Sequence, residues 1–191
     1  MKVCIYGSAS NEIDKIYKDT TKELGLRLAK RGHSLVFGAG SDGLMGAAAR
    51  GFKEGNGYVH GFIPKFFEEN GYEAIFYEAD KITFTETMAQ RKAGMENECD
   101  AFIVVPGGLG TFEEFFQIYT LKQLGRHKKA IVLFNIAGYY DSMIELLKKS
   151  TREGFINEEC ESLIKITSDI DEAIDYVESY NAGDVDWNSL K

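Results

Sequence analysis

The sequence predicts one α/β domain, a doubly wound parallel sheet with helices covering both faces. Short apolar segments of strand length alternate with longer segments of helical periodicity along the 191 residues. This length suits one domain with a full-sized core, and no repeat, linker or low-complexity segment divides the chain. Loops rich in glycine or serine follow three of the apolar segments, where parallel sheets bind ligands. We assign the domain to residues 1–180 and expect residues 181–191 to form a loosely ordered tail.

The composition argues against several classes of partner. The chain has 22 Lys and Arg against 30 Asp and Glu, and its formal charge of −8 disfavours a non-specific nucleic-acid binder. Three distant cysteines without a C-x-x-C pair favour a reduced, cytoplasmic location. The amino-terminal segment is too short for a signal peptide, and no apolar run approaches the roughly 20 residues of a membrane span. The three histidines are isolated, so we expect no metal site.

The first half of the chain alternates regularly between strand and helix patterns. Strands are predicted at residues 3–6, 34–37 and 58–63, and helices at residues 12–30, from the second glycine loop to about residue 54, and at 85–98. Gly32 lies where helix C-termini favour glycine. Residues 65–81 mix aromatic and acidic side chains, and we expect a short helix and a short strand there. Met88, Arg91 and Met95 share one stripe of the third helix.

The chain is organised around one strand, one turn and one helix in its second half. Residues 101–105 form an apolar run typical of a strand buried on both faces. Pro106 ends this strand because it has no N–H to donate, and Thr111 is predicted to open the next helix. Later strands are predicted at residues 130–134 and 163–166, and later helices at residues 139–153 and from a Ser168 cap to residue 179.

Two glycine-rich turns are candidates for nucleotide binding. The turn at residues 107–111 joins a strand to a helix, so its backbone N–H groups and the helix dipole favour a phosphate. Gly38-x-Gly-x-x-Gly43 matches the dinucleotide fingerprint, but the next predicted strand ends in Pro64-Lys65, where an acid should bind the ribose. The glycines of this second turn suit either close helix–strand packing or a loop over a mononucleotide.

Glu114 and Arg91 each admit two interpretations. Thr111-x-x-Glu114 is a capping-box pattern, in which Glu114 accepts a hydrogen bond from the Thr111 N–H. The same helix is apolar almost all round, which withdraws Glu114 from bulk water and suits a catalytic carboxylate. Arg91 lies on an apolar stripe and requires a partner. That partner is either Glu114 or another acid, or a phosphate or ribose oxygen of a ligand.

Six short motifs follow one another between Val3 and Ile156. They are Gly43-Leu-Met-Gly46, Met88-Ala-Gln-Arg-Lys92, Pro106-Gly-Gly-Leu-Gly-Thr-Phe-Glu-Glu114, Gln123-Leu-Gly125, Gly138-Tyr-Tyr140 and Glu153-Gly-Phe-Ile156. Together they resemble the LOG family of cytokinin riboside 5′-monophosphate phosphoribohydrolases, also labelled lysine decarboxylase-like. The P-G-G-x-G-T-x-x-E signature with an upstream R-K pair is highly specific. The resemblance implies a Rossmann-like fold and a homodimer.

The resemblance also implies the site residues. Arg91 and Glu114 match the family's catalytic arginine and glutamate, and the turn at residues 107–111 takes the phosphate. We expect the substrate to be bound by Gly107, Gly108, Gly110, Thr111, Lys92, Ser8, Gly40, Gly43, Met88 and Thr120. The chain departs from the family pattern at Ala9, Ala39, Ala89 and Gly94.

The implied reaction is hydrolysis of the N-glycosidic bond of adenosine 5′-monophosphate or an N6-substituted derivative, with release of the base and ribose 5-phosphate. A carboxylate beside C1′ stabilises the developing positive charge and activates water. No cofactor is required, whereas a decarboxylase would need pyridoxal phosphate on a lysine, and Lys92 is the only lysine beside a motif. The alternative is a non-catalytic nucleotide sensor with the same pocket, and an NAD-linked oxidoreductase ranks third.

Overall fold

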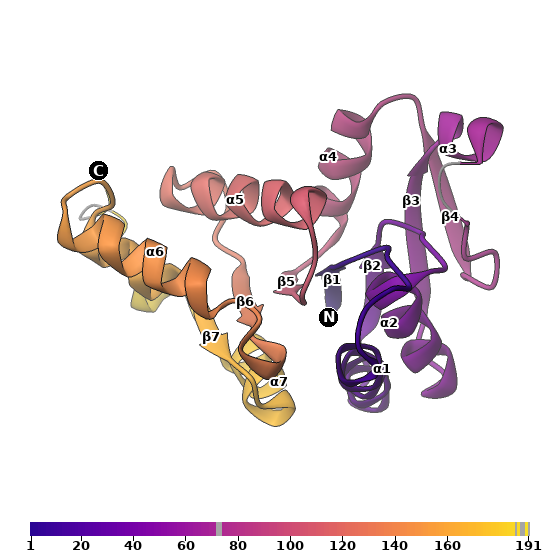
Figure 1. The fold of residues 1–191 in the computed structure, drawn as a ribbon, viewed down its shortest axis with the longest axis horizontal. Helices are drawn as coiled ribbons and strands as arrows, with labels where there is room; N and C mark the ends of the chain where they lie inside the picture. The colour runs from indigo at the N-terminus through magenta and orange to yellow at the C-terminus, as the bar shows by residue number, and fades with distance from the viewer. Residues whose placement is uncertain (72–73, 186, 188–189, 191) are drawn as a thin grey trace.

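The computed structural model describes residues 1–71, 74–185, 187 and 190. Its strands form one parallel sheet in the order β4-β3-β2-β1-β5-β6-β7 (Figure 1). The strands are β1 (Lys2–Tyr6), β2 (Ser34–Phe37), β3 (Val59–Pro64), β4 (Lys81–Thr85), β5 (Ala101–Val104), β6 (Ala130–Phe134) and β7 (Lys165–Thr167). The order reverses direction at β1, which pairs with β2 on one side and β5 on the other. The predicted doubly wound, Rossmann-like fold is confirmed.

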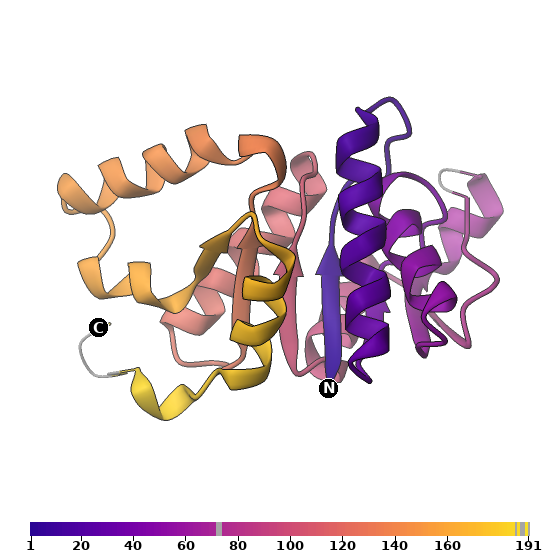
Figure 2. The ribbon, with the colours of Figure 1, turned by 90° about the horizontal axis from the view of Figure 1, so that it is seen from below.

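Helices cover both faces of the sheet, as Figures 1 and 2 show. One face carries α1 (Lys15–Lys30), α2 (Gly43–Glu54) and α7 (Ile170–Ser179), and the other carries α4 (Met88–Glu98), α5 (Leu109–Gln123) and α6 (Asp141–Arg152). The shorter helices are α3 (Lys65–Asn70) and the 3₁₀ turns η1 (Ile136–Gly138), η2 (Glu158–Leu163) and η3 (Ala182–Asp184). Within the described residues, no helix combines the length and apolarity that crossing a bilayer requires.

The core consists of two apolar layers, one on each face of the sheet. Strand β5 is buried along its whole length, and its alternate side chains enter opposite layers. Ile103 packs in the layer under α1, α2 and α7, whereas Phe102 packs under α4 and α5. Each fully buried aliphatic or aromatic side chain of this kind contributes about 1.5–3 kcal/mol, so the central strands fix the sheet on which the loops are mounted.

Several predicted boundaries are wrong, and the helix predicted from residue 12 begins at Lys15. The helix predicted from residue 85 begins at Met88, because residues 81–85 form the edge strand β4 and Thr87 caps the helix by accepting a hydrogen bond from the Gln90 N–H at 3.1 Å. The last strand begins at Lys165 instead of residue 163, because the 3₁₀ turn η2 precedes it. The final helix is capped by Asp169, whose carboxylate accepts from the Glu172 N–H at 2.9 Å, and not by Ser168.

The segment after α7 is described only in part, because residues 186, 188, 189 and 191 lie outside the described residues. Trp187 donates its indole N–H to the Ala182 carbonyl at 2.9 Å, and the Lys128 ammonium lies 5.1 Å from its ring centroid. Leu190 is buried in the layer with α5. These contacts hold described parts of the predicted tail against the domain.

Candidate active site

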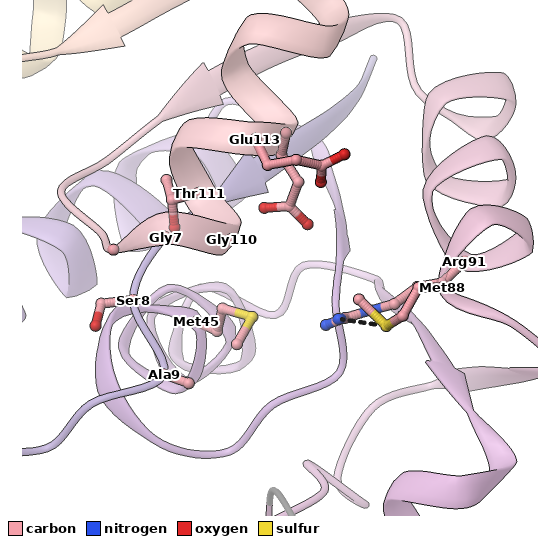
Figure 3. Close-up of a pocket in the computed structure, with 11 residues that line it drawn as sticks. Gly7, Ser8, Ala9, Met45, Met88, Arg91, Gly110, Thr111 and Glu113 are labelled. Carbon is pink, nitrogen blue, oxygen red and sulfur yellow. Dashed lines mark hydrogen bonds between the residues drawn. The ribbon is translucent and has the colours of Figure 1, made fainter.

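A cavity of about 290 Å³ opens beyond the carboxyl ends of β1, β2 and β5 (Figure 3). Sheet order explains its position, because the chain passes from β1 to α1 on one face of the sheet and from β5 to α5 on the other, so the loops after these two neighbouring strands diverge. The first loop, the start of α2, α4 and the start of α5 each supply part of the wall. The lining residues are Gly7, Ser8, Ala9, Met45, Met88, Arg91, Gly108, Gly110, Thr111, Glu113 and Glu114.

The start of α5 forms the part of this wall that the sequence predicts to bind the phosphate. The helix begins at Leu109, with Gly108 as its N-cap in an extended conformation (φ −95°, ψ −152°). Thr111 therefore lies inside the first turn and does not open the helix, so the predicted capping box between Thr111 and Glu114 does not form. The first N–H groups of a helix have no intrahelical acceptor, and here Gly110 and Thr111 line the cavity.

The start of α2, by contrast, is satisfied by the protein itself. The N–H of Gly43 donates to the Asn11 side-chain oxygen at 2.9 Å, and the N–H of Leu44 donates to the Ser8 carbonyl at 2.7 Å. The loop before α2 is also held by backbone pairing, since Gly40 forms an isolated antiparallel β-bridge with Ile75. These contacts favour the close-packing interpretation of the second glycine turn over a dinucleotide fingerprint.

Arg91 is held by backbone carbonyl groups. The residue is 5% exposed, and its guanidinium donates from Nε to the Phe62 carbonyl at 3.1 Å and from Nη2 to the Gly38 carbonyl at 2.7 Å. Nη1 lies 3.9 Å from the Met88 sulfur, and the ring of Phe67 lies 5.7 Å from the guanidinium carbon. A Cβ on Gly38 would lie 1.9 Å from Nη2, so only glycine permits this approach. Carbonyl dipoles from the ends of β2 and β3 thus support the charge at the cavity wall.

Two adjacent carboxylates of α5 line the opposite side. Glu114 is partly buried, and Glu113 forms an ion pair with Lys92 of α4. The Tyr6 hydroxyl is buried and has no hydrogen-bond partner among the described residues. Burial, and to a smaller degree the neighbouring Cys4 and Glu114, raises the Tyr6 pKa well above its ordinary value, so this phenol stays protonated.

A second cavity of about 230 Å³ lies beside the first and shares Ser8 and Gly108 with it. Its other lining residues are Ile13, Tyr17, Pro106, Gly107 and Tyr139. The Tyr139 hydroxyl donates to the Gly107 carbonyl at 2.5 Å, and its ring meets Tyr17 edge-on with the centroids 6.0 Å apart. These contacts brace the glycine turn from the side away from Arg91.

The structure brings together most of the residues expected from the sequence. The ones that line the first cavity are Arg91, Glu114, Gly108, Gly110, Thr111, Ser8 and Met88, and Gly107 lines the second. Gly40, Gly43, Lys92 and Thr120 are not among the residues described as lining either cavity. Four lining residues were not among the expected site residues: Met45, Glu113, and Gly7 and Ala9, whose loop was expected to line the crevice. Glu113 could have been predicted from its position, because it directly precedes the predicted catalytic residue Glu114.

Solved structures share the fold. The molybdenum cofactor carrier protein of Chlamydomonas reinhardtii aligns with a TM-score of 0.70 and 21% identity, covering 93% of this chain and 95% of that one. A molybdenum cofactor binding protein of Rippkaea orientalis aligns with a TM-score of 0.69 and 20% identity, covering 93% of this chain and 95% of that one. At this level of identity, the likeness concerns the arrangement of strands and helices.

Sequence comparison finds relatives of higher identity than these structures. A family model described as "possible lysine decarboxylase" matches residues 45–177. The cytokinin riboside 5′-monophosphate phosphoribohydrolase LOG1 of Arabidopsis thaliana is 36% identical over 181 residues, covering 94% of this chain and 83% of the relative. The enzyme of the same activity named LOG in Oryza sativa subsp. japonica is 35% identical over 186 residues, covering 95% of this chain and 76% of the relative. Matches of this extent show that the chain belongs to the LOG family.

Proposed function

We propose that the protein hydrolyses the N-glycosidic bond of adenosine 5′-monophosphate or its N6-substituted derivatives, releasing the base and ribose 5-phosphate. One observation carries the proposal: a single cavity combines the open start of α5, the Arg91 guanidinium and the Glu114 carboxylate. Relatives about one-third identical over most of their length are named as enzymes of this activity.

The phosphate binds at the start of α5, where Gly110 and Thr111 present backbone N–H groups and the positive end of the helix dipole. Binding there fixes the sugar, so energy from a non-reacting part of the substrate supplies orientation at C1′. The phosphate end is thereby separated from the Arg91 side of the cavity, which is formed by α4.

Glu114 acts on the anomeric carbon. As the base departs, positive charge develops on the ribose, and a carboxylate next to C1′ stabilises it and orients or deprotonates the attacking water. Arg91 already donates to two carbonyls, so its Nη1 edge beside Met88 is the one directed at a substrate oxygen. The residues of this cavity perform the reaction without a cofactor.

We further propose that the enzyme is cytoplasmic and works as a homodimer. Support for a dimer comes from large apolar side chains that the single chain leaves exposed, among them Leu109 and Leu124 at the two ends of α5 and Phe155 after α6. Leu109 is 87% exposed and lies within the turn at residues 107–111. Covering Leu109 would bury part of the cavity rim, because its neighbours Gly108 and Gly110 line the cavity.

The proposal predicts that a 5′-phosphate is required. Purified protein should release free base and ribose 5-phosphate from adenosine 5′-monophosphate and from an N6-prenylated derivative, and chromatography of the products measures both. With adenosine, kcat/KM should fall at least about 100-fold, because the anchoring phosphate is absent. Equal values for the nucleoside and the nucleotide would contradict the assigned phosphate site. Nucleotide binding without product would identify a sensor instead of an enzyme.

A further inference from the structure

The two helices that carry the proposed catalytic residues are joined by polar contacts directly beside those residues. Lys92 follows the proposed catalytic arginine on α4, and it forms an ion pair with Glu113, which precedes the proposed catalytic glutamate on α5. One turn further along both helices, the Gln117 amide donates to the Glu96 carboxylate. The partners on each helix are four residues apart, so the two contacts follow one stripe of α4 and one stripe of α5.

The ion pair lies at the edge of the cavity, and only one of its two partners lines that cavity. Glu113 lines the cavity, whereas Lys92 is not among its described lining residues. The Lys92 side chain is 16% exposed and the Glu113 side chain is 55% exposed, so the pair is partly open to solvent. Pairs of this kind contribute little to overall stability. What the pair supplies is a direct link between α4 and α5 beside the two proposed catalytic residues.

This geometry matters because the two proposed catalytic residues are anchored to different parts of the sheet. Arg91 is bonded to carbonyls at the ends of β2 and β3. Glu114 belongs to α5, which follows β5 on the other side of β1. The Lys92–Glu113 and Glu96–Gln117 contacts link the two helices directly, next to the guanidinium and the carboxylate. Displacements on the order of 1 Å at reacting groups reduce rates by about 100-fold.

We infer that the Lys92–Glu113 ion pair is a positioning device that sets the distance between Arg91 and Glu114. The inference rests on the proposed function, since it assigns a role in that reaction to two further residues. Lys92 acts through Glu113 and the two helices, and it does not contact the substrate. Under the same inference, the Glu96–Gln117 contact supports the pair from the next turn.

The test removes the ion pair in a single variant and then restores it with its charges reversed in a double variant. Lys92→Met should lower kcat for adenosine 5′-monophosphate by about 10- to 100-fold while KM changes less than about threefold, because orientation is lost and phosphate binding is kept. The double variant Lys92→Glu with Glu113→Lys restores an ion pair of opposite sense. It should recover kcat to within about fivefold of the parent.

A direct contact between Lys92 and the phosphate would give a different pattern. KM would rise in Lys92→Met, and the double variant would be worse, because a glutamate would then face the phosphate. That pattern overturns the inference. The matched control is the Lys22–Glu54 pair, which joins α1 and α2 at 2.7 Å. Lys22→Met and the reversal Lys22→Glu with Glu54→Lys should leave kcat unchanged.

A crystal structure of Lys92→Met separates this inference from the proposed function. The distance between Arg91 Cζ and Glu114 Cδ should differ from the parent value by about 1 Å or more, whether or not the parent protein releases base. An unchanged distance overturns the positioning role. A parent protein that shows no turnover overturns the proposed reaction, and the crystallographic distance still decides whether the pair sets the separation.

Discussion

Arg91 and Glu114 reach the same cavity in different electrostatic settings. The Arg91 charge is supported by the Phe62 and Gly38 carbonyls, which are fixed parts of the sheet ends. Glu114 lies in the second turn of α5, beyond the first N–H groups, because the N-cap is Gly108. It is therefore too far along the helix to cap it. The capping role that the sequence offered as an alternative for Glu114 is therefore excluded, because α5 begins two residues before Thr111.

Replacing Glu114 by glutamine tests its catalytic role. Glu114→Gln keeps the shape and hydrogen-bonding capacity of the side chain but removes the negative charge, so kcat should fall by about 100-fold or more. The melting temperature and the affinity for adenosine 5′-monophosphate should change little, because the anion-binding turn is untouched. Calorimetry and single-turnover product analysis measure these quantities. The control is Glu145→Gln on α6, which should retain full activity, and turnover near the parental rate in Glu114→Gln would refute the mechanism.

At the scale of elements, α4 is seated by a contact between a glycine and an aromatic ring. A Cβ on Gly94 would lie 2.7 Å from two ring carbons of Phe62, and that ring packs on His60 with the centroids 4.3 Å apart. Phe62 also supplies the carbonyl that accepts from Arg91. The absence of a side chain at Gly94 lets the helix lie close enough to β3 for this hydrogen bond.

This contact predicts the sign of a substitution. Helix propensity alone makes Gly94→Ala stabilising by about 1 kcal/mol. The clash with Phe62 should instead make it destabilising by about 1–3 kcal/mol. In a Phe62→Val background the ring is gone, and Gly94→Ala should become neutral or stabilising. Urea denaturation of the four proteins measures the cycle, and a stabilised Gly94→Ala single variant would show that the ring moves aside freely.

The elements whose limits the sequence predicted best are those that are buried along their whole length. The strand at residues 130–134 is buried on both faces and reads as a continuous apolar run, so its limits matched. The short strand expected within residues 65–81 was misplaced: β4 extends from Lys81 to Thr85, and a partly exposed edge strand has no such run to mark its limits. Leu109 begins α5 yet is highly exposed, so hydrophobic periodicity gave no sign of it. The partners of Arg91 could not be predicted either, because backbone carbonyls carry no sequence signal and a fold must bring them to the guanidinium.

At the scale of the whole molecule, Lys122 connects α5 to the carboxyl-terminal part of the chain. Its side chain is fully buried, donates to the Leu163 carbonyl at 2.6 Å and lies 4.4 Å from the centroid of the Tyr180 ring. Burial lowers the Lys122 pKa to about 7. Between about pH 7 and the ordinary value of 10.5, the unfolded chain binds a proton at Lys122 that the folded protein does not. Stability should therefore rise with pH in this range and fall as the pH drops toward 7.

The pH dependence predicts a difference between the parent and Lys122→Met. Between pH 7 and 8.5, the free energy of unfolding of the parent should increase by about 1.5 kcal/mol relative to the variant. The lost bond to the Leu163 carbonyl adds an offset that does not vary with pH. His127 does not interfere, since its pKa is lowered from 6.5 by burial and it titrates below this range. Urea denaturation at three pH values measures the slope, the exposed Lys148→Met is the control, and parallel curves would contradict the assignment.

The position of β1 between β2 and β5 has a consequence for synthesis on the ribosome. Synthesis proceeds at about 5–20 residues per second, so α5, which ends 25 residues after α4, is completed about 1–5 s later than α4. During that interval, Arg91 can already meet its carbonyl partners on β2 and β3, but Glu114 and the anion-binding turn do not yet exist. A nucleotide in the cell thus cannot assist the folding of the first half. The edge of β1 that β5 will cover stays open to other chains until translation supplies its neighbour.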